Sequence, residues 1–226
     1  MVSARQIIPK SNYLFFDALP RATVRAFNKC SEIYFFLRDA WYLAGGTALA
    51  LQVGHRSSVD LDFFTKRKLF NEKRVEENMS KYGKWVTNSI SNGTLYGEFL
   101  GAKISFIAYH FFTPAELMRK QGAVSLLAPL DIAVMKIIAV SQRGRKRDFF
   151  DLYWICQNAS PLHDILLRVR KQYFASQNIF HILKALVYFE DAETDPEPVI
   201  YFDADWKKVK KFFIKEIPLI AKKLIK

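Results

Sequence analysis

The stretch GGTALALQVGHRSSVDLDFF, residues 45–64, decides the fold, because it joins a glycine pair to a segment that carries two carboxylates. It comes directly after the run WYLA (41–44), which favours a β-strand. The alanines and leucines that follow the glycines predict a short helix that ends at Gly54. Residues 58–64 predict a second strand, so we expect the order strand, glycine turn, helix, strand.

Two aspartates, Asp60 and Asp62, lie two positions apart in the predicted second strand. Side chains with this spacing point to the same face of a strand, so both carboxylates should project together. Leu61 and Phe63 should then pack on the opposite face. Adjacent carboxylates repel one another unless a cation lies between them. Mg²⁺ suits this position because it takes one or two carboxylates together with substrate phosphate oxygens.

The glycine pair offers a place for that phosphate. Gly45, Gly46 and Thr47 lie at the start of the predicted short helix, where backbone amides attract anions. Glycine also lets a phosphate approach the backbone closely. A phosphate site beside a metal-binding pair is the arrangement that nucleotidyl transfer requires. The alternative is structural, because either aspartate could cap a turn or pair with Arg56.

The composition limits the class of protein. The chain has 226 residues and a formal net charge of +12, which favours a polyanionic partner such as nucleic acid, or an acidic protein. A lysine-rich solvated surface would give the same charge. Two cysteines suit a reducing compartment and argue against a disulfide framework. No apolar run is long enough to cross a bilayer, so we expect a soluble, cytoplasmic protein without a membrane partner.

The hydrophobic periodicity changes part-way along the chain. WVTNSI (85–90), TLYGEF (94–99) and AKISFIAYHF (102–111) predict strands, so we expect residues 1–128 to form an α/β domain with a small mixed sheet and flanking helices. Beyond that point the period is helical. We therefore expect residues 129–226 to form a helical bundle that packs against the first domain.

The sequence resembles a known family in two separate blocks. The pattern GGT…GHRSSVDLDFF resembles the nucleotidyltransferase superfamily signature of a glycine pair followed by D-x-D, and more narrowly the AbiEii/AbiGii family of nucleotidyltransferase-like toxins from abortive-infection and toxin–antitoxin operons. LLAPLDIAVMKIIAVSQRGRKRDFFDLYWI (126–155) resembles the later motif of that family. VYFEDAETDPEP (187–198) and DWKKVKKFF (205–213) resemble the C-terminal region of one branch. The resemblance covers nearly the whole chain.

The resemblance implies an NTP substrate and a role for each matched residue. Asp60 and Asp62 would bind Mg²⁺ or Mn²⁺, and Lys136 would contact the triphosphate. Together with Asp151, the acid of the last motif, they form the implied catalytic set. The implied nucleotide-binding residues are Gly45, Gly46, Thr47, Arg56, Ser58, Lys136 and Arg143.

Spacing in the second block agrees with these roles. Lys136 and Arg143 lie seven residues apart on one predicted helix, so they share a face and present positive charge toward a phosphate. Asp148 and Asp151 are three residues apart at the start of the next predicted helix and also share a face. One of them could accept a hydroxyl proton or orient Lys136. The alternative is a set of ion pairs on the helix surfaces.

The chain departs from the superfamily pattern at one position. Active members usually carry a third carboxylate on a later strand, where this chain has Ser105. Glu98, on the preceding predicted strand, could substitute if the hairpin register brings it alongside. Two carboxylates can hold one Mg²⁺ with help from substrate phosphates, but they leave a second metal without its usual ligand.

The sequence therefore predicts an α/β (α+β) protein that transfers a nucleoside monophosphate from NTP to an acceptor hydroxyl in a Mg²⁺-dependent reaction. By family analogy, the acceptor is RNA, with tRNA 3′ ends as the first choice, and a cognate antitoxin from an adjacent gene is the regulatory partner. Two alternatives remain open. One is a catalytically impaired nucleotide- or RNA-binding protein of the same fold, which Ser105 motivates; the other is a protein-interaction module.

Overall fold

The computed structural model describes residues 13–174 and 177–224, which divide into two compact units. Tyr13–Ala128 form the first, called here the sheet unit, and the second, the helical unit, is built from Pro129 onward. Each unit has buried hydrophobic residues that form a core of its own.

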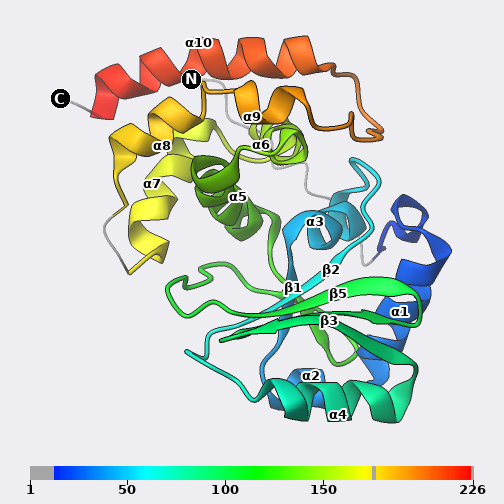
Figure 1. Cartoon of the computed structure of the whole chain (residues 1–226). Helices are drawn as coiled ribbons and strands as arrows, with labels where there is room; N and C mark the ends of the chain where they lie inside the picture. Colours follow the sequence, from blue (N-terminus) through cyan, green and yellow to red (C-terminus); the bar gives the residue numbers. More distant parts are fainter. Residues whose placement is uncertain (1–12, 175–176, 225–226) are drawn as a thin grey trace. The chain divides into compact units, whose positions relative to one another are not determined.

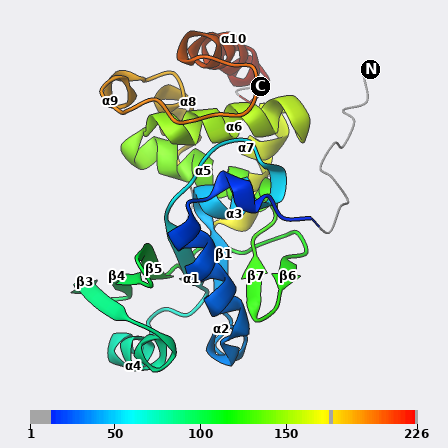
Figure 2. The ribbon, with the colours of Figure 1, turned by 90° about the vertical axis from the view of Figure 1, so that its right-hand side faces the viewer.

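Within the described residues, a seven-stranded mixed sheet forms the centre of the sheet unit (Figures 1 and 2). The strand order is β3-β4-β5-β2-β1-β7-β6. The strands are β1 (Tyr42–Ala44), β2 (Leu61–Thr65), β3 (Trp85–Ser91), β4 (Thr94–Phe99), β5 (Ala102–Ala108), β6 (Arg119–Gln121) and β7 (Val124–Leu126). β1 is antiparallel to β2 and parallel to β7, whereas β2 is parallel to β5. The predicted α/β fold class with a mixed sheet is confirmed.

Helices cover both sides of this sheet. They are η1 (Phe16–Ala18, a 3₁₀ turn), α1 (Arg21–Glu32), α2 (Tyr34–Arg38), α3 (Gly45–Val53) and α4 (Glu72–Tyr82). α2 and α4 lie on the side of the sheet opposite to α3 (Figure 1). The ring of Phe63 on β2 packs 4.5 Å from that of Phe36 on α2 and 5.6 Å from that of Phe106 on β5, measured between centroids. These buried rings pack one face of β2 into the core. Asp62, which follows Leu61, points to the opposite face.

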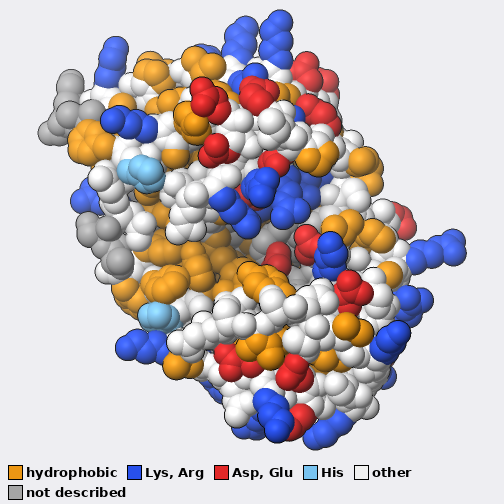
Figure 3. All heavy atoms as spheres, in the orientation of Figure 1, with side chains coloured by type: hydrophobic (Ala, Val, Ile, Leu, Met, Phe, Trp, Pro, Cys, Tyr) orange, Lys and Arg blue, Asp and Glu red, His pale blue; other side chains and the backbone are white. Residues whose placement is uncertain are grey.

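The helical unit consists of helices packed around α5. The helices are α5 (Pro129–Arg143), α6 (Lys146–Asn158), α7 (Leu162–Gln172), α8 (Ile179–Ala185), α9 (Glu190–Glu193) and α10 (Trp206–Leu224). Phe149 on α6 contacts Trp206 and Phe213 on α10 with ring centroids 5.6 and 5.4 Å apart, which anchors the last helix. Lysine side chains project along the outer surface of α10 (Figure 3). None of the described helices combines the length and apolar character that a membrane span requires.

Cys30 gives a simple test of this core. It is completely buried in α1, and burial raises the pKa of its thiol because the thiolate is disfavoured away from water. We expect Cys30 to stay unlabelled when the native protein is treated with a thiol reagent at pH 8, and to react fully in guanidinium chloride. Mass spectrometry of the labelled peptides measures both states. Rapid labelling of Cys30 in the native protein would contradict this packing.

Candidate active site

The glycine pair and the two aspartates meet where β1 ends and β2 begins, in the interior of the strand order. Ala44, the last residue of β1, pairs with Asp62 on β2, so the turn that follows β1 lies beside the start of β2. Asp60 immediately precedes β2, and both aspartates are half-buried, whereas Leu61 and Phe63 between and after them are fully buried. The alternation places both carboxylates on the face that is not packed into the core.

Gly45 brings the backbone of the turn directly against Asp62. Its φ is +71°, in the left-handed region that favours glycine. A Cβ at this position would also lie 3.0 Å from Oδ2 of Asp62. Both the conformation and the space therefore require glycine, and the first turn of α3 touches one of the two carboxylates.

Gly46 makes room for a buried guanidinium. A Cβ here would lie 2.2 Å from Nη2 of Arg56 and 3.2 Å from Oγ of Ser58. Arg56 is only 3% exposed, and its Nη1 donates to the Ser57 carbonyl at 2.8 Å. The N-terminus of α3 has no side-chain cap. A fixed positive charge thus lies over an uncapped helix N-terminus, and both features favour a bound phosphate.

Replacing Gly46 with alanine tests this arrangement. The added methyl group overlaps the far end of the buried, flexible Arg56 side chain, so the guanidinium must shift and we expect a loss of about 1 kcal/mol in the free energy of unfolding. NTP affinity should fall at least about tenfold, because Arg56 is displaced from the turn. Thermal unfolding and equilibrium titration with an NTP measure the two effects.

The double variant Gly46→Ala, Arg56→Ala is the matched control. It removes the overlap, so stability should return toward that of the Arg56→Ala single variant while NTP affinity stays low. Wild-type NTP affinity in Gly46→Ala would show that Arg56 is not a phosphate ligand.

Thr47 holds the loop that carries Asp60. Its hydroxyl donates to the backbone carbonyl of Asp60 and lies 2.8 Å from Oγ of Ser58. The Thr47 side chain is 1% exposed. The Thr47 hydroxyl is therefore engaged inside the loop, where it positions the backbone of Asp60.

Ser105 lies directly beside Asp62 on the neighbouring strand. The two residues are paired in register between β2 and β5, and Ser105 Oγ donates to Asp62 Oδ1 at 2.5 Å. The register of the next strand pairs Tyr96 with Ser105 and Glu98 with Lys103. Glu98 is exposed and is not brought alongside the aspartates, so the condition under which it could replace a third carboxylate is not met.

The donor set of this site suits one divalent cation with open coordination. Among the described residues, no group of three or more His, Cys, Asp or Glu side chains is arranged to hold a metal ion. The sheet unit instead offers Asp60 and Asp62 on one half-buried face. Mg²⁺ commonly keeps several waters and is held by one or two carboxylates plus substrate phosphates. The residues present therefore fit a cation that arrives with a nucleotide.

The second block forms a buried ionic cluster inside the helical unit. Lys136 Nζ on α5 lies 2.5 Å from Asp148 Oδ1 and 2.7 Å from Asp151 Oδ2, both on α6. Both aspartates are fully buried and Lys136 is 7% exposed, so these are not ion pairs of the helix surface. Arg143, whose side chain is 58% exposed, reaches only to 3.9 Å from Asp148 Oδ2. Lys136 and Arg143 thus share a face of α5 toward Asp148.

Two contacts of the site were not foreseen from the sequence. Arg56 over Gly46 and Thr47 on Asp60 depend on the path of the loop between α3 and β2, which local pattern does not determine. Phe64 was not singled out as a site residue, yet it is half-buried and two positions beyond Asp62. The signal was the alternation itself, which puts residues 60, 62 and 64 on one face.

The fold defined above is that of the nucleotidyltransferases. A crystal structure of a candidate nucleotidyltransferase from H. pylori matches with a TM-score of 0.55 at 15% identity and covers 91% of this chain and 97% of that chain. MenT4, the nucleotidyltransferase toxin Rv2826c from Mycobacterium tuberculosis H37Rv, matches with a TM-score of 0.50 at 16% identity and covers 85% and 86%. At these low sequence identities, the two matches show only that this chain shares its fold with those proteins.

Sequence comparison identifies the family. The model of the family described as nucleotidyl transferase AbiEii toxin, type IV toxin–antitoxin system, matches residues 33–88 and 104–224. The uncharacterised protein aq_aa25 of Aquifex aeolicus (strain VF5) is 35% identical over 185 residues, which cover 78% of this chain and 86% of that protein. The chain belongs to the AbiEii family of nucleotidyltransferase toxins, and it is an enzyme of the transferase class.

Proposed function

We propose that this protein transfers a nucleoside monophosphate from an NTP to a hydroxyl of an RNA acceptor, with Mg²⁺ bound by Asp60 and Asp62. The observation that carries the proposal is the placement of the two carboxylates beside a glycine turn over which Arg56 is buried. One site then offers ligands for a metal and for phosphate. The formal net charge of +12 supports a polyanionic acceptor, and tRNA 3′ ends are our first choice by family analogy.

The chain's own residues bind and orient the triphosphate. Backbone amides of the first turn of α3, the Arg56 guanidinium and the Ser58 hydroxyl are the proposed phosphate ligands. Ser105 donates to one oxygen of Asp62 and so fixes the direction of that carboxylate. Mg²⁺, or Mn²⁺ in its place, would supply charge neutralisation at the α-phosphate. Held in this way, the α-phosphate is aligned for attack.

The reaction exchanges one bond to the α-phosphorus for another. The acceptor oxygen forms a bond to the α-phosphorus, and the bond from that phosphorus to the oxygen bridging to the β-phosphate breaks. Pyrophosphate leaves with the bonding electrons, and the acceptor hydroxyl gives up its proton to a carboxylate or to water. We expect this in-line displacement to depend more on positioning than on covalent chemistry by the protein.

We also infer, from the family resemblance, that Lys136 contributes to triphosphate binding and that Asp151 belongs to the catalytic set. A lysine ammonium has three N–H donors, and Asp148 and Asp151 take two of them. In this proposal Asp148 positions Lys136, and Arg143 adds a more exposed positive charge.

Incubation with labelled NTPs, Mg²⁺ and total tRNA tests the proposal. We expect label to appear on RNA with at least one of the four nucleotides and to be lost when EDTA is added. Absence of label transfer with all four nucleotides, while a tRNA nucleotidyltransferase control works, would count against catalysis. A cognate antitoxin gene beside this one would support the proposed regulatory role.

A second candidate function is nucleotide or RNA binding without turnover. The observation that favours it is Ser105, which takes the strand position where active superfamily members usually carry a third carboxylate. Under this alternative, NTP affinity is the same with Mg²⁺ and with EDTA, and it does not change when both aspartates are replaced. The first proposal requires both quantities to change.

A further inference from the structure

The exposed face of β2 continues beyond the two aspartates. Asp62 and Phe64 lie two residues apart, a distance of about 6.6 Å since a strand rises about 3.3 Å per residue, and both are half-buried. Two residues further on, Lys66 follows the end of β2 and is exposed. The carboxylate and the aromatic ring therefore share one face of β2, and an exposed ammonium group follows directly after the strand.

Phe64 belongs to a small aromatic wall in the sheet unit. Its ring stacks on Tyr42 with centroids 6.0 Å apart and meets Tyr109 edge-on at 5.6 Å. The amide of Tyr109 donates to the Thr65 carbonyl at 2.8 Å, which holds the segment after β5 against the end of β2. Phe64 and Tyr109 are both half-buried, so part of this aromatic surface remains open for a flat ligand.

A positively charged cavity of about 480 Å³ lies where β2 ends and β1 begins. It lies beside α2, and its walls include Phe36, Trp41, Tyr42, Lys66, Arg67 and Lys120, so a strand that follows β2 reaches it by passing the end of β2. We call it the basic pocket, because none of its lining residues is acidic and the three cations on its rim are exposed. Arg67 is partly neutralised by Asp39 at 3.6 Å. The indole N–H of Trp41, a lining residue, is buried and has no acceptor among the described residues.

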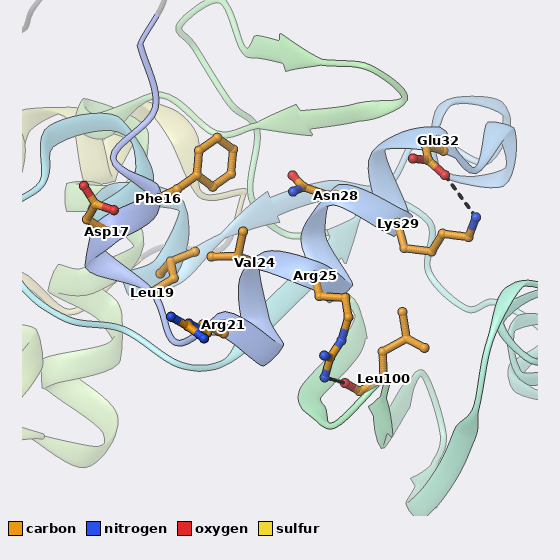
Figure 4. Close-up of a pocket in the computed structure, with 10 residues that line it drawn as sticks. All are labelled: Phe16, Asp17, Leu19, Arg21, Val24, Arg25, Asn28, Lys29, Glu32 and Leu100. Carbon is orange, nitrogen blue, oxygen red and sulfur yellow. Dashed lines mark hydrogen bonds and ion pairs between the residues drawn. The ribbon is translucent and has the colours of Figure 1, made fainter.

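A larger groove in the same unit has a different charge balance. It measures about 750 Å³ and runs along α1 (Figure 4). Two of its three cations have partners within the groove, because Lys29 lies 3.0 Å from Glu32 and Arg25 donates to the Leu100 carbonyl at 3.0 Å. Asp17 adds a second acidic side chain to its wall. The basic pocket is therefore the better match for a phosphate.

We propose that the acceptor strand runs along β2, with an unpaired base against Phe64 and Tyr109 and an upstream phosphate in the basic pocket. This inference rests on the proposed function, because it takes the strand's terminal hydroxyl to lie at Asp60 and Asp62. Proteins that bind single strands combine aromatic surfaces for bases with a positive groove for the backbone. The acceptor is accordingly a single-stranded RNA end.

Binding of a fluorescent six-nucleotide RNA in the absence of NTP and metal tests the inference. Each phosphate contact to a single strand contributes about 0.7 to the slope of log K against log salt concentration. We expect Lys66→Ala, Lys120→Ala to make that slope shallower by about 1.4, which is two contacts, and to weaken binding at low salt. The matched control is Lys73→Ala, Lys81→Ala, which removes the same charge from exposed positions on α4 and should leave the slope unchanged.

Two results would overturn the inference. One is an equal slope for Lys66→Ala, Lys120→Ala and its control. The other concerns a single nucleoside monophosphate, which is too short to reach both the aspartates and the basic pocket. The inference fails if Lys66→Ala, Lys120→Ala weakens binding of this mononucleotide as much as it weakens binding of the six-nucleotide RNA. Because the assay needs no turnover, its failure is separable from that of the proposed function. The expected change in slope without label transfer would remove the catalytic proposal alone, whereas label transfer with an unchanged slope would remove the basic pocket alone.

Discussion

Replacing Asp60 and Asp62 together with asparagine should abolish nucleotide transfer and leave the fold intact. The two carboxylates are the proposed metal ligands, and metal-ion stabilisation of a transition state is worth several kcal/mol. A loss of about 4 kcal/mol corresponds to about a thousandfold lower rate. Asparagine keeps the shape of each side chain, and its carbonyl oxygen at position 62 can still accept from Ser105. The loss in the free energy of unfolding should therefore stay at about 1 kcal/mol or less, a net hydrogen-bond contribution, which thermal unfolding measures.

Glu98→Gln is the matched control for this experiment. Glu98 is an exposed carboxylate of the same sheet, and the register pairs it with Lys103 rather than with Ser105. We expect unchanged transfer and unchanged stability. Label transfer by the asparagine double variant at the wild-type rate would remove the metal site from the mechanism. A large fall in its melting temperature would instead make the aspartates structural.

Lys136→Met should destabilise the helical unit by about 3–5 kcal/mol, because it leaves two buried carboxylates without their cation. Lys136 lies within 2.7 Å of Asp148 and Asp151, and both aspartates are fully buried. One oxygen of Asp148 already has no hydrogen-bond partner among the described residues, so loss of the ammonium adds to an unmet demand for donors. Chemical denaturation of the wild type and the variant measures the difference.

Two further variants separate burial from charge in this cluster. Arg143→Ala removes a cation of the same helix that is 58% exposed and 3.9 Å from Asp148, so it should cost less than about 1 kcal/mol. Asp148→Asn, Asp151→Asn in the Lys136→Met background removes both uncompensated charges and should recover part of the lost stability. Equal stability of Lys136→Met and wild type would contradict the buried cluster. Full stability with reduced NTP affinity would assign Lys136 to nucleotide binding alone.

The segment around the glycine pair was predictable because its signals are local. Gly45 requires a left-handed φ, Gly54 ends the helix at an αL position, and the alternation of Asp60 to Phe63 assigns faces. The strands expected at 85–90, 94–99 and 102–111 correspond to β3, β4 and β5 for the same reason. The helical period beyond Pro129 likewise gave α5 to α7.

What the sequence missed depends on contacts between distant residues. β6 and β7 have three residues each, too few to show a period, and β7 exists because it pairs in parallel with β1. The strand expected from residue 58 begins at Leu61, because the amide of Ser58 donates to the Ala18 carbonyl and the Asp60 carbonyl accepts from Thr47. Arg56 is buried for a similar reason, because the path of the loop between α3 and β2 brings its guanidinium against Gly46. The pattern of neighbouring residues in the sequence cannot predict a hydrogen bond between residues that are far apart in the chain, such as Ser58 and Ala18.

Calorimetric titration with an NTP analogue that cannot be cleaved between the α- and β-phosphates tests the metal-and-triphosphate site most directly. Titrations in Mg²⁺ and in EDTA, for the wild type and the Asp60→Asn, Asp62→Asn variant, give four affinities. We predict tight binding only for the wild type in Mg²⁺, with at least about tenfold weaker binding in the other three. Equal affinity in all four titrations would contradict a metal-dependent nucleotide site at these two aspartates.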